Sequence, residues 1–125
     1  MIREVLPVKG AYVLHVEEKY DHRGRSIALR QCLPFVPVAE LIVHSVSGVV
    51  RGLHYQKGLE KIVWCLSGEI VDVGVDLRVS SSTYGKHYSH VLTGGTSSPI
   101  RVPDGVAHGI RVISREPATV LYQFS

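Results

Sequence analysis

The sequence predicts an all-β protein, a sandwich or barrel of the jelly-roll type, with residues 1–125 forming a single domain. Its apolar runs are short, rich in Val and Ile, and separated by Gly, Pro and Ser, which is typical of strands joined by turns. The clearest run is "IVDVGVDLR", where apolar residues alternate with Asp72, Gly74 and Asp76. A chain of this length can bury one hydrophobic core.

The predicted strands follow one another along the chain with turn sequences between them. They cover residues 11–16, 41–46, 48–54, 60–66, 70–78, 86–92, 98–102, 108–113 and 118–124. Turns are predicted at "DHRG", "SVSG", "LSGE", "TGG" and "PDG", and a loop at "SSSTYGK". Successive residues of a strand face opposite sides, so Asp72 and Asp76 lie either on a solvated face or toward a ligand cavity. The alternation alone does not decide between these positions.

Composition and charge exclude some classes of protein. The net charge of +3 is spread over 14 basic and 11 acidic residues without a basic stripe, which favours a small anionic ligand over nucleic acid. No run is long enough for a transmembrane helix, and "MIREVLPVKGAYVL" lacks a leader's apolar segment, so we expect no membrane association and a cytoplasmic location. Cys32 and Cys65 lie in apolar surroundings without a CxxC spacing, which predicts buried free thiols.

Two histidine motifs stand in the chain, one near its middle and one toward its end. Gly-x-His occupies residues 52–54, and "PDGVAHG" at 103–109 has a proline and a glycine that shape a tight turn before His108. Each signal is weak alone. Together with a strand that ends at Gly68, they resemble the paired signature of the cupin jelly rolls, and that resemblance implies that His54 and His108 converge on the mouth of the barrel.

Longer segments resemble the dTDP-4-dehydrorhamnose 3,5-epimerase family. "RGLHYQ", "EKIVWCLSGEIVDVGVDLR", "SSSTYGK", "VPDGVAHGI" and "VLY" follow in the family's order at nearly its spacing, and "DHRGR" resembles its N-terminal element. The resemblance implies an epimerase of a nucleotide-linked 4-keto-6-deoxyhexose, carried by dTDP, that needs no cofactor and forms a homodimer. Such a reaction needs a base, a donor for the enolate oxygen, and an acid on the opposite face of the sugar.

The resemblance also implies a role for individual residues. His54 is the expected base, because imidazole can take up a proton near neutral pH. Lys61, paired with Asp72, is expected to face the developing oxyanion, and Tyr122 to act as the acid. Each residue also has a structural alternative. His54 could be a hydrogen-bonded structural histidine, Lys61 and Asp72 a surface ion pair, and Tyr122 a core aromatic. The residues expected to bind substrate are Arg23, Arg51, Gln56 and His108, the arginines because guanidinium groups suit phosphate oxygens.

The chain departs from the family in two places. The connection from His54 to Lys61 is shorter than usual, and "HYQKGLEKIVWCLSG" also resembles a segment of metal-binding cupins and of sugar 3,4-ketoisomerases. A metal there would use His54, Glu60 and His108, but Gln56 stands where that motif has a histidine, so we predict no metal. The sequence also ends at Ser125, before the family segment that supplies an aspartate orienting the base. A ketoisomerase, a metal-binding cupin and a catalytically weak sugar-nucleotide-binding module therefore remain alternatives.

Overall fold

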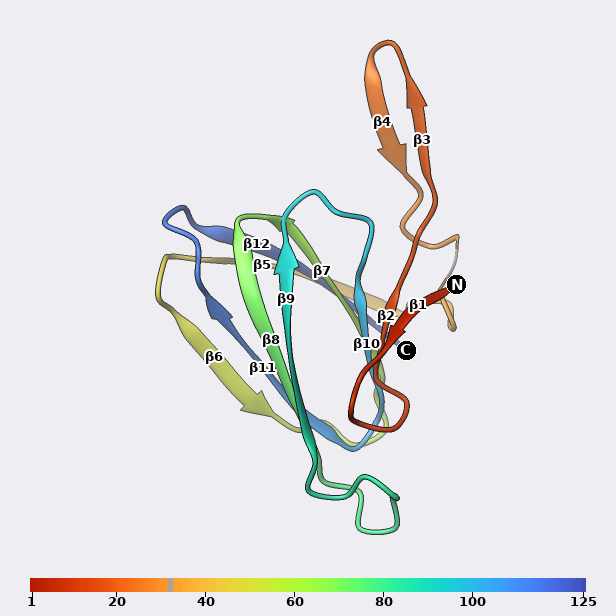
Figure 1. Ribbon diagram of the computed structural model, residues 1–125, viewed down its shortest axis with the longest axis vertical. Helices are drawn as coiled ribbons and strands as arrows, with labels where there is room; N and C mark the ends of the chain where they lie inside the picture. The colour runs from red at the N-terminus through yellow and green to blue at the C-terminus, as the bar shows by residue number, and fades with distance from the viewer. Residues whose placement is uncertain (32) are drawn as a thin grey trace.

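The computed structural model describes residues 1–31 and 33–125, which form two antiparallel sheets packed face to face and a separate hairpin (Figure 1). The six-stranded sheet has the order β1-β2-β10-β7-β12-β5, the four-stranded sheet has the order β6-β11-β8-β9, and β3 pairs with β4. The strands are β1 Ile2–Val5, β2 Tyr12–Leu14, β3 Glu18–Asp21, β4 Gly24–Ile27, β5 Ala39–Ser45, β6 Val50–His54, β7 Lys61–Ser67, β8 Glu69–Asp76, β9 His87–Thr93, β10 Ile100–Val102, β11 Val106–Val112 and β12 Ala118–Phe124.

All of the predicted strands correspond to strands of the structure, namely β2 and β5 to β12, and the all-β sandwich is confirmed. The sequence analysis missed β1, β3 and β4. These strands are short and largely exposed, so they lack the alternation of apolar and polar residues that marks a half-buried strand. The predicted turn "DHRG" is confirmed as the connection between β3 and β4, and this hairpin projects from the sandwich (Figure 1).

The main hydrophobic core lies between the two sheets. Val63, Ile100 and Val120 of the six-stranded sheet pack there with Ile70 and Ile110 of the four-stranded sheet. The outer face of the six-stranded sheet holds a second cluster, which the segment after β4 covers: Leu14, Val16, Ile62, Trp64 and Leu121 pack with Tyr12, Ile27, Leu29, Leu33 and Phe35. Because both faces of β7 are packed against other side chains, this strand is a rigid support for the site described below.

The alternation in β8 is confirmed, but the interior side is the polar one. Asp72 and Asp76 are both fully buried with Ile70 and Gly74, whereas the valines between them face outward and are half-buried. The interpretation that places the two aspartates on a solvated face is therefore wrong. Buried carboxylates require hydrogen-bond partners, and both aspartates have them.

Asp76 fastens the "SSSTYGK" loop, which the structure confirms as the connection between β8 and β9. Its carboxylate accepts hydrogen bonds from Arg78 Nε at 2.9 Å, Ser81 Oγ at 2.7 Å and Thr83 Oγ1 at 2.6 Å. The Arg78 guanidinium in particular holds the pKa of Asp76 well below its usual value of 3.8. The ionised form of Asp76 is therefore favoured by folding.

Asp76→Asn should lower the free energy of unfolding by about 2 kcal/mol at pH 7, because the bonds that Arg78 donates lose their charged acceptor. A lowered pKa means that the carboxylate's contribution is fully present above pH 3.8 and is lost as the pH falls through the lower value of the folded state. Urea unfolding should thus show a difference from wild type that is large at pH 7 and shrinks toward pH 2. Glu116→Gln, at an exposed turn, is the control; equal stability of wild type and Asp76→Asn at pH 7 would contradict this account.

Candidate active site

A cavity of about 430 Å³ lies between the two sheets. The six-stranded sheet contributes one wall and β6 and β11 of the four-stranded sheet contribute the other, with the residues that follow β6 at the rim. The lining residues are Leu41, Val43, Arg51, Leu53, His54, Tyr55, Gln56, Lys61, His108, Gly109, Tyr122 and Phe124. The structure thus brings together most of the residues that the sequence analysis selected; Asp72 and Arg23 lie elsewhere.

A bulge in β6 places both Arg51 and His54 at the cavity. Residues three apart face opposite sides of a regular strand. Here His54 pairs with His108 and Arg51 pairs with Ile110, so β6 has one residue more than β11 over this stretch. Gly52 makes the bulge possible: its φ is 137°, and a Cβ there would lie 2.6 Å from the Cα of Gly109. Backbone packing therefore requires the glycine of the Gly-x-His motif.

Arg51 is held in position by the strand beside the cavity. Its Nε donates a hydrogen bond to Ser45 Oγ, 2.7 Å away, at the end of β5. Among the residues that the structure describes, Nε is the one side-chain nitrogen of Arg51 with a hydrogen-bond partner, which leaves the terminal nitrogens of the guanidinium for a ligand. Positive charge at the wall suits the phosphate groups of a nucleotide.

Asp72 lies behind the cavity wall and bonds to two side chains. Its Oδ2 is 2.6 Å from His108 Nε2, and its Oδ1 accepts a hydrogen bond of 2.8 Å from the Tyr88 hydroxyl. The expected pairing of Asp72 with Lys61 is wrong, since Lys61 has no carboxylate within 4 Å among the residues that the structure describes. The strand register explains why Asp72 contacts His108. Asp72 stands opposite Ile110 on β11, and His108, two residues from Ile110 on that strand, has its side chain on the same interior face of the sheet.

Lys61 projects into the cavity from the first position of β7. Burial lowers the pKa of its ammonium, and the charge of Asp72 opposes this effect from a distance. The Nζ atom lies 5.9 Å from the centre of the Phe124 ring. A partly desolvated ammonium with no close carboxylate is suited to an anion that forms in the cavity.

Tyr122 faces the same space from β12. Its ring meets that of His108 edge to face, with 6.0 Å between the centres. Burial, together with the nearby charge of Asp72, raises the pKa of the Tyr122 phenol to about 12, against the opposing effect of Arg51. The hydroxyl therefore keeps its proton at neutral pH and can donate it.

The metal set considered from sequence is not assembled. Glu60 Oε2 accepts a hydrogen bond of 2.8 Å from Arg101 Nε and a second from the same guanidinium, and Glu60 does not line the cavity. His108 Nε2 is already bonded to Asp72. Within residues 1–31 and 33–125, no three His, Cys, Asp or Glu side chains are grouped so as to hold a metal ion.

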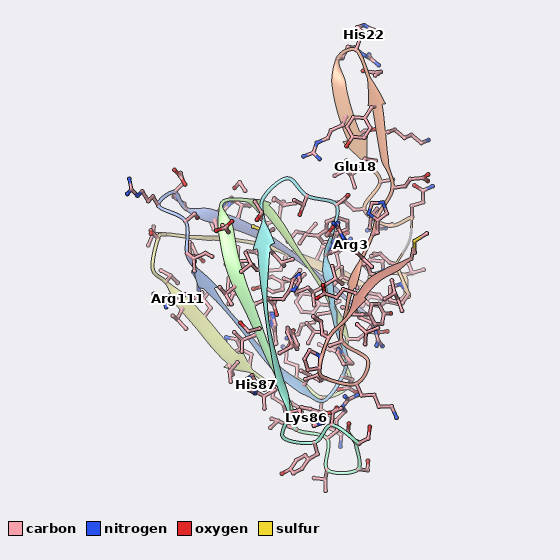
Figure 2. All side chains as sticks on the ribbon, viewed as in Figure 1. Arg3, Glu18, His22, Lys86, His87 and Arg111 are labelled. Carbon is pink, nitrogen blue, oxygen red and sulfur yellow. The ribbon has the colours of Figure 1, made fainter. Side chains whose placement is uncertain are left out.

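Arg23 lies outside the cavity of its own chain. It stands in the turn of the β3–β4 hairpin, where its side chain is 79% exposed and pairs with Asp21 at 2.7 Å. Figure 2 shows the neighbouring His22 at the far tip of the hairpin and Glu18 nearer the sandwich. Glu18 and Arg25 pair with each other, and Arg25 also donates to the carbonyl of Gly95, so the hairpin is fixed at its base.

The cysteine prediction is confirmed for Cys65, which is a buried free thiol. Burial raises the pKa of this thiol to about 11, so it stays protonated and unreactive. Cys32 lies outside the described residues. No helix in the described part of the chain is long and apolar enough to cross a membrane.

Sequence reasoning missed three contributors to the site: Tyr88, Gly74 and the apolar wall from β5. Leu41 and Val43 of that wall belong to an ordinary strand pattern and carry no distinguishing signal. Tyr88 stands opposite Gly74 in the β8–β9 register. A tyrosine that faces a glycine is recognisable only when the register of the two strands is known.

A sandwich of these two sheets, with a histidine-lined cavity between them, is a cupin-type jelly roll, as predicted. Residues 5–125 match the dTDP-4-dehydrorhamnose 3,5-epimerase family, and the chain belongs to this family. A curated 3,5-epimerase from Methanothermobacter thermautotrophicus is 45% identical over 116 residues, 86% of this chain and 63% of the relative. The chain spans about half the length of the curated relatives that it matches.

Two solved structures extend the comparison. The dTDP-4-dehydrorhamnose 3,5-epimerase of Elizabethkingia anophelis is 35% identical, with a TM-score of 0.88 over 99% of this chain and 73% of that one. An epimerase of Legionella pneumophila, solved in complex with dTDP-4-keto-L-rhamnose, is 29% identical, with a TM-score of 0.88 over 99% of this chain and 70% of that one.

Proposed function

We propose that this chain epimerises a dTDP-linked 4-keto-6-deoxyhexose. The observation that carries the proposal is the position of two groups on opposite walls of one cavity: His54 on β6 of one sheet and Tyr122 on β12 of the other. A base and an acid on opposite sides of a sugar ring are what inversion of a carbon requires. The family match and the dTDP-sugar bound by the L. pneumophila relative support this substrate class.

The proposed reaction proceeds through an enolate. His54 takes the proton from a carbon beside the ketone, and the electron pair of that C–H bond moves into the ketone, whose oxygen becomes negative. Lys61 stabilises this oxyanion with its ammonium group. Tyr122 then gives its proton to the same carbon from the opposite face, which regenerates the ketone with inverted configuration.

Substrate binding is assigned to residues around these groups. Arg51 is proposed to bind the diphosphate, and Gln56 at the rim and His108 on the wall to contact the sugar nucleotide. A role for Arg23 in binding stays a prediction, since this residue is outside the cavity of its own chain. A role for Asp72 in catalysis is proposed only through its contact with His108.

We also infer a homodimer. The edge strand β5 supports this inference, because Leu41 and Ile42 are 52% and 55% exposed and the strand has one side without a pairing partner in the six-stranded sheet. Light scattering at micromolar concentration measures the assembly directly. The buried free thiol of Cys65 agrees with a reducing compartment, and a cytoplasmic location stays a prediction.

The function is tested with dTDP-4-keto-L-rhamnose in deuterated water containing excess chelator. Proton NMR should show deuterium entering beside the ketone, together with signals of the epimerised sugar. The chelator should have no effect, because no step of the proposed mechanism uses a metal ion.

Each other outcome contradicts part of the proposal. A sugar that binds without exchanging protons would indicate a binding module. A carbonyl that moves to C3 would indicate a ketoisomerase. Loss of activity on chelation, restored by a divalent cation, would indicate a metal-binding cupin.

A further inference from the structure

Tyr88 and Gly74 fit together inside the four-stranded sheet. They stand opposite each other on β9 and β8, and the Tyr88 side chain is 1% exposed. A Cβ on Gly74 would lie 2.2 Å from Cε2 of the Tyr88 ring, a distance that no side chain tolerates. The missing side chain at Gly74 therefore provides the space in which the Tyr88 ring lies.

The Tyr88 ring reaches the active-site wall from behind. Its hydroxyl donates a hydrogen bond of 2.8 Å to Asp72 Oδ1, and Asp72 Oδ2 is 2.6 Å from Nε2 of His108, which lines the cavity. Burial, with the charge of Asp72 as a further cause, raises the pKa of the Tyr88 phenol far above its usual value of 10. The hydroxyl thus stays protonated at neutral pH and remains a donor to Asp72.

We propose that Tyr88 is a positioning residue for the reaction, acting through Asp72 on His108; this inference rests on the proposed function. A carboxylate anchored at both oxygens cannot rotate, so it holds the imidazole in one orientation. An ionised carboxylate only accepts hydrogen bonds, so Nε2 of His108 carries the proton. His108 then presents Nδ1, as an acceptor, toward a hydroxyl group of the sugar.

A purely space-filling Tyr88 would make a different prediction, and the ring can be separated from the hydroxyl. Tyr88→Phe keeps the ring in the space beside Gly74 and removes only the donor to Asp72. Tyr84→Phe is the matched control, because Tyr84 is 56% exposed on the loop between β8 and β9 and has no contact with the cavity.

Two readouts test the proposal. In ¹⁵N NMR of the free protein, His108 should be a single Nε2-protonated tautomer in wild type and in Tyr84→Phe, and a mixture of tautomers in Tyr88→Phe. In steady-state kinetics, Tyr88→Phe should lower kcat/KM for the sugar nucleotide about tenfold and leave the affinity for dTDP alone nearly unchanged, because the positioning contact acts on the sugar and not on the nucleotide.

The two failures are distinguishable. If wild type does not turn over the sugar, the proposed function fails, and the tautomer of His108 still tests the positioning contact. A folded Tyr88→Phe protein with a single His108 tautomer and a wild-type kcat/KM overturns the inference. If Tyr88→Phe does not fold, wild type decides: the Tyr88 hydroxyl proton should exchange slowly with water, and an exchange rate equal to that of exposed Tyr84 overturns the inference.

Discussion

His54→Asn should reduce turnover by at least about a hundredfold, the loss expected when a general base is removed. The imidazole is exposed at the end of β6 and lines the cavity, so its removal takes away the proton acceptor without emptying the core. Stability and dTDP binding should therefore stay close to wild type. Turnover is followed by NMR of dTDP-4-keto-L-rhamnose, and affinity by calorimetry with dTDP.

His87→Asn is the matched control, because His87 is an exposed histidine at the start of β9 and does not line the cavity. Figure 2 shows where His87 lies. The His87→Asn variant should behave as wild type in both measurements. A His54→Asn protein that retains more than about a tenth of wild-type turnover would rule out His54 as the base and direct attention to His108 on the same wall.

Tyr122→Phe should abolish inversion while some proton exchange continues. The substitution keeps the ring that packs against His108 and removes the only proton that Tyr122 can donate. His54 can still remove the substrate proton and return one to the face from which it came. NMR in deuterated water should thus show deuterium entering the sugar with retained configuration, and Tyr84→Phe should invert normally.

Loss of exchange together with inversion would mean that Tyr122 acts earlier, in binding or in forming the enolate. Normal inversion by Tyr122→Phe would assign the acid to another group. The raised pKa of Tyr122, about 12, adds a further expectation. Because the phenol stays protonated, activity should not decline between pH 8 and pH 10 through ionisation of this residue.

The parts of the fold that could be predicted are those where a local pattern reflects burial. Alternation identified β8, and glycine-bounded apolar runs identified the other sandwich strands, whereas the exposed β3–β4 hairpin offered no such pattern. The alternation of β8 did not reveal which face is buried. That choice depends on Tyr88 and His108, which lie on the two neighbouring strands.

The candidate site, too, could be predicted only in part. The resemblance of the two histidine motifs to those of cupins implied that His54 and His108 converge, and both line the cavity. The partner of Asp72 could not be predicted, because contacts between strands depend on the register in which the strands pair. That register cannot be read from a short segment of sequence. The bulge at Gly52 is a further example: it decides where Arg51 points, and it requires a glycine there because Gly109 passes close by.

The position of the two proposed catalytic residues on different sheets affects how this protein responds to mutation of its core. Since His54 and Tyr122 belong to different sheets, the distance between the proposed base and the proposed acid is set by the thickness of the sandwich, and hence by the core side chains between the sheets, such as Val63 and Ile110. Replacing a core residue with one that is smaller by one methylene group allows the two sheets to move closer together or to tilt. Variants that unfold at nearly the normal temperature are then expected to lose catalytic rate, because the hydrophobic core sets the distance between the two proposed catalytic residues.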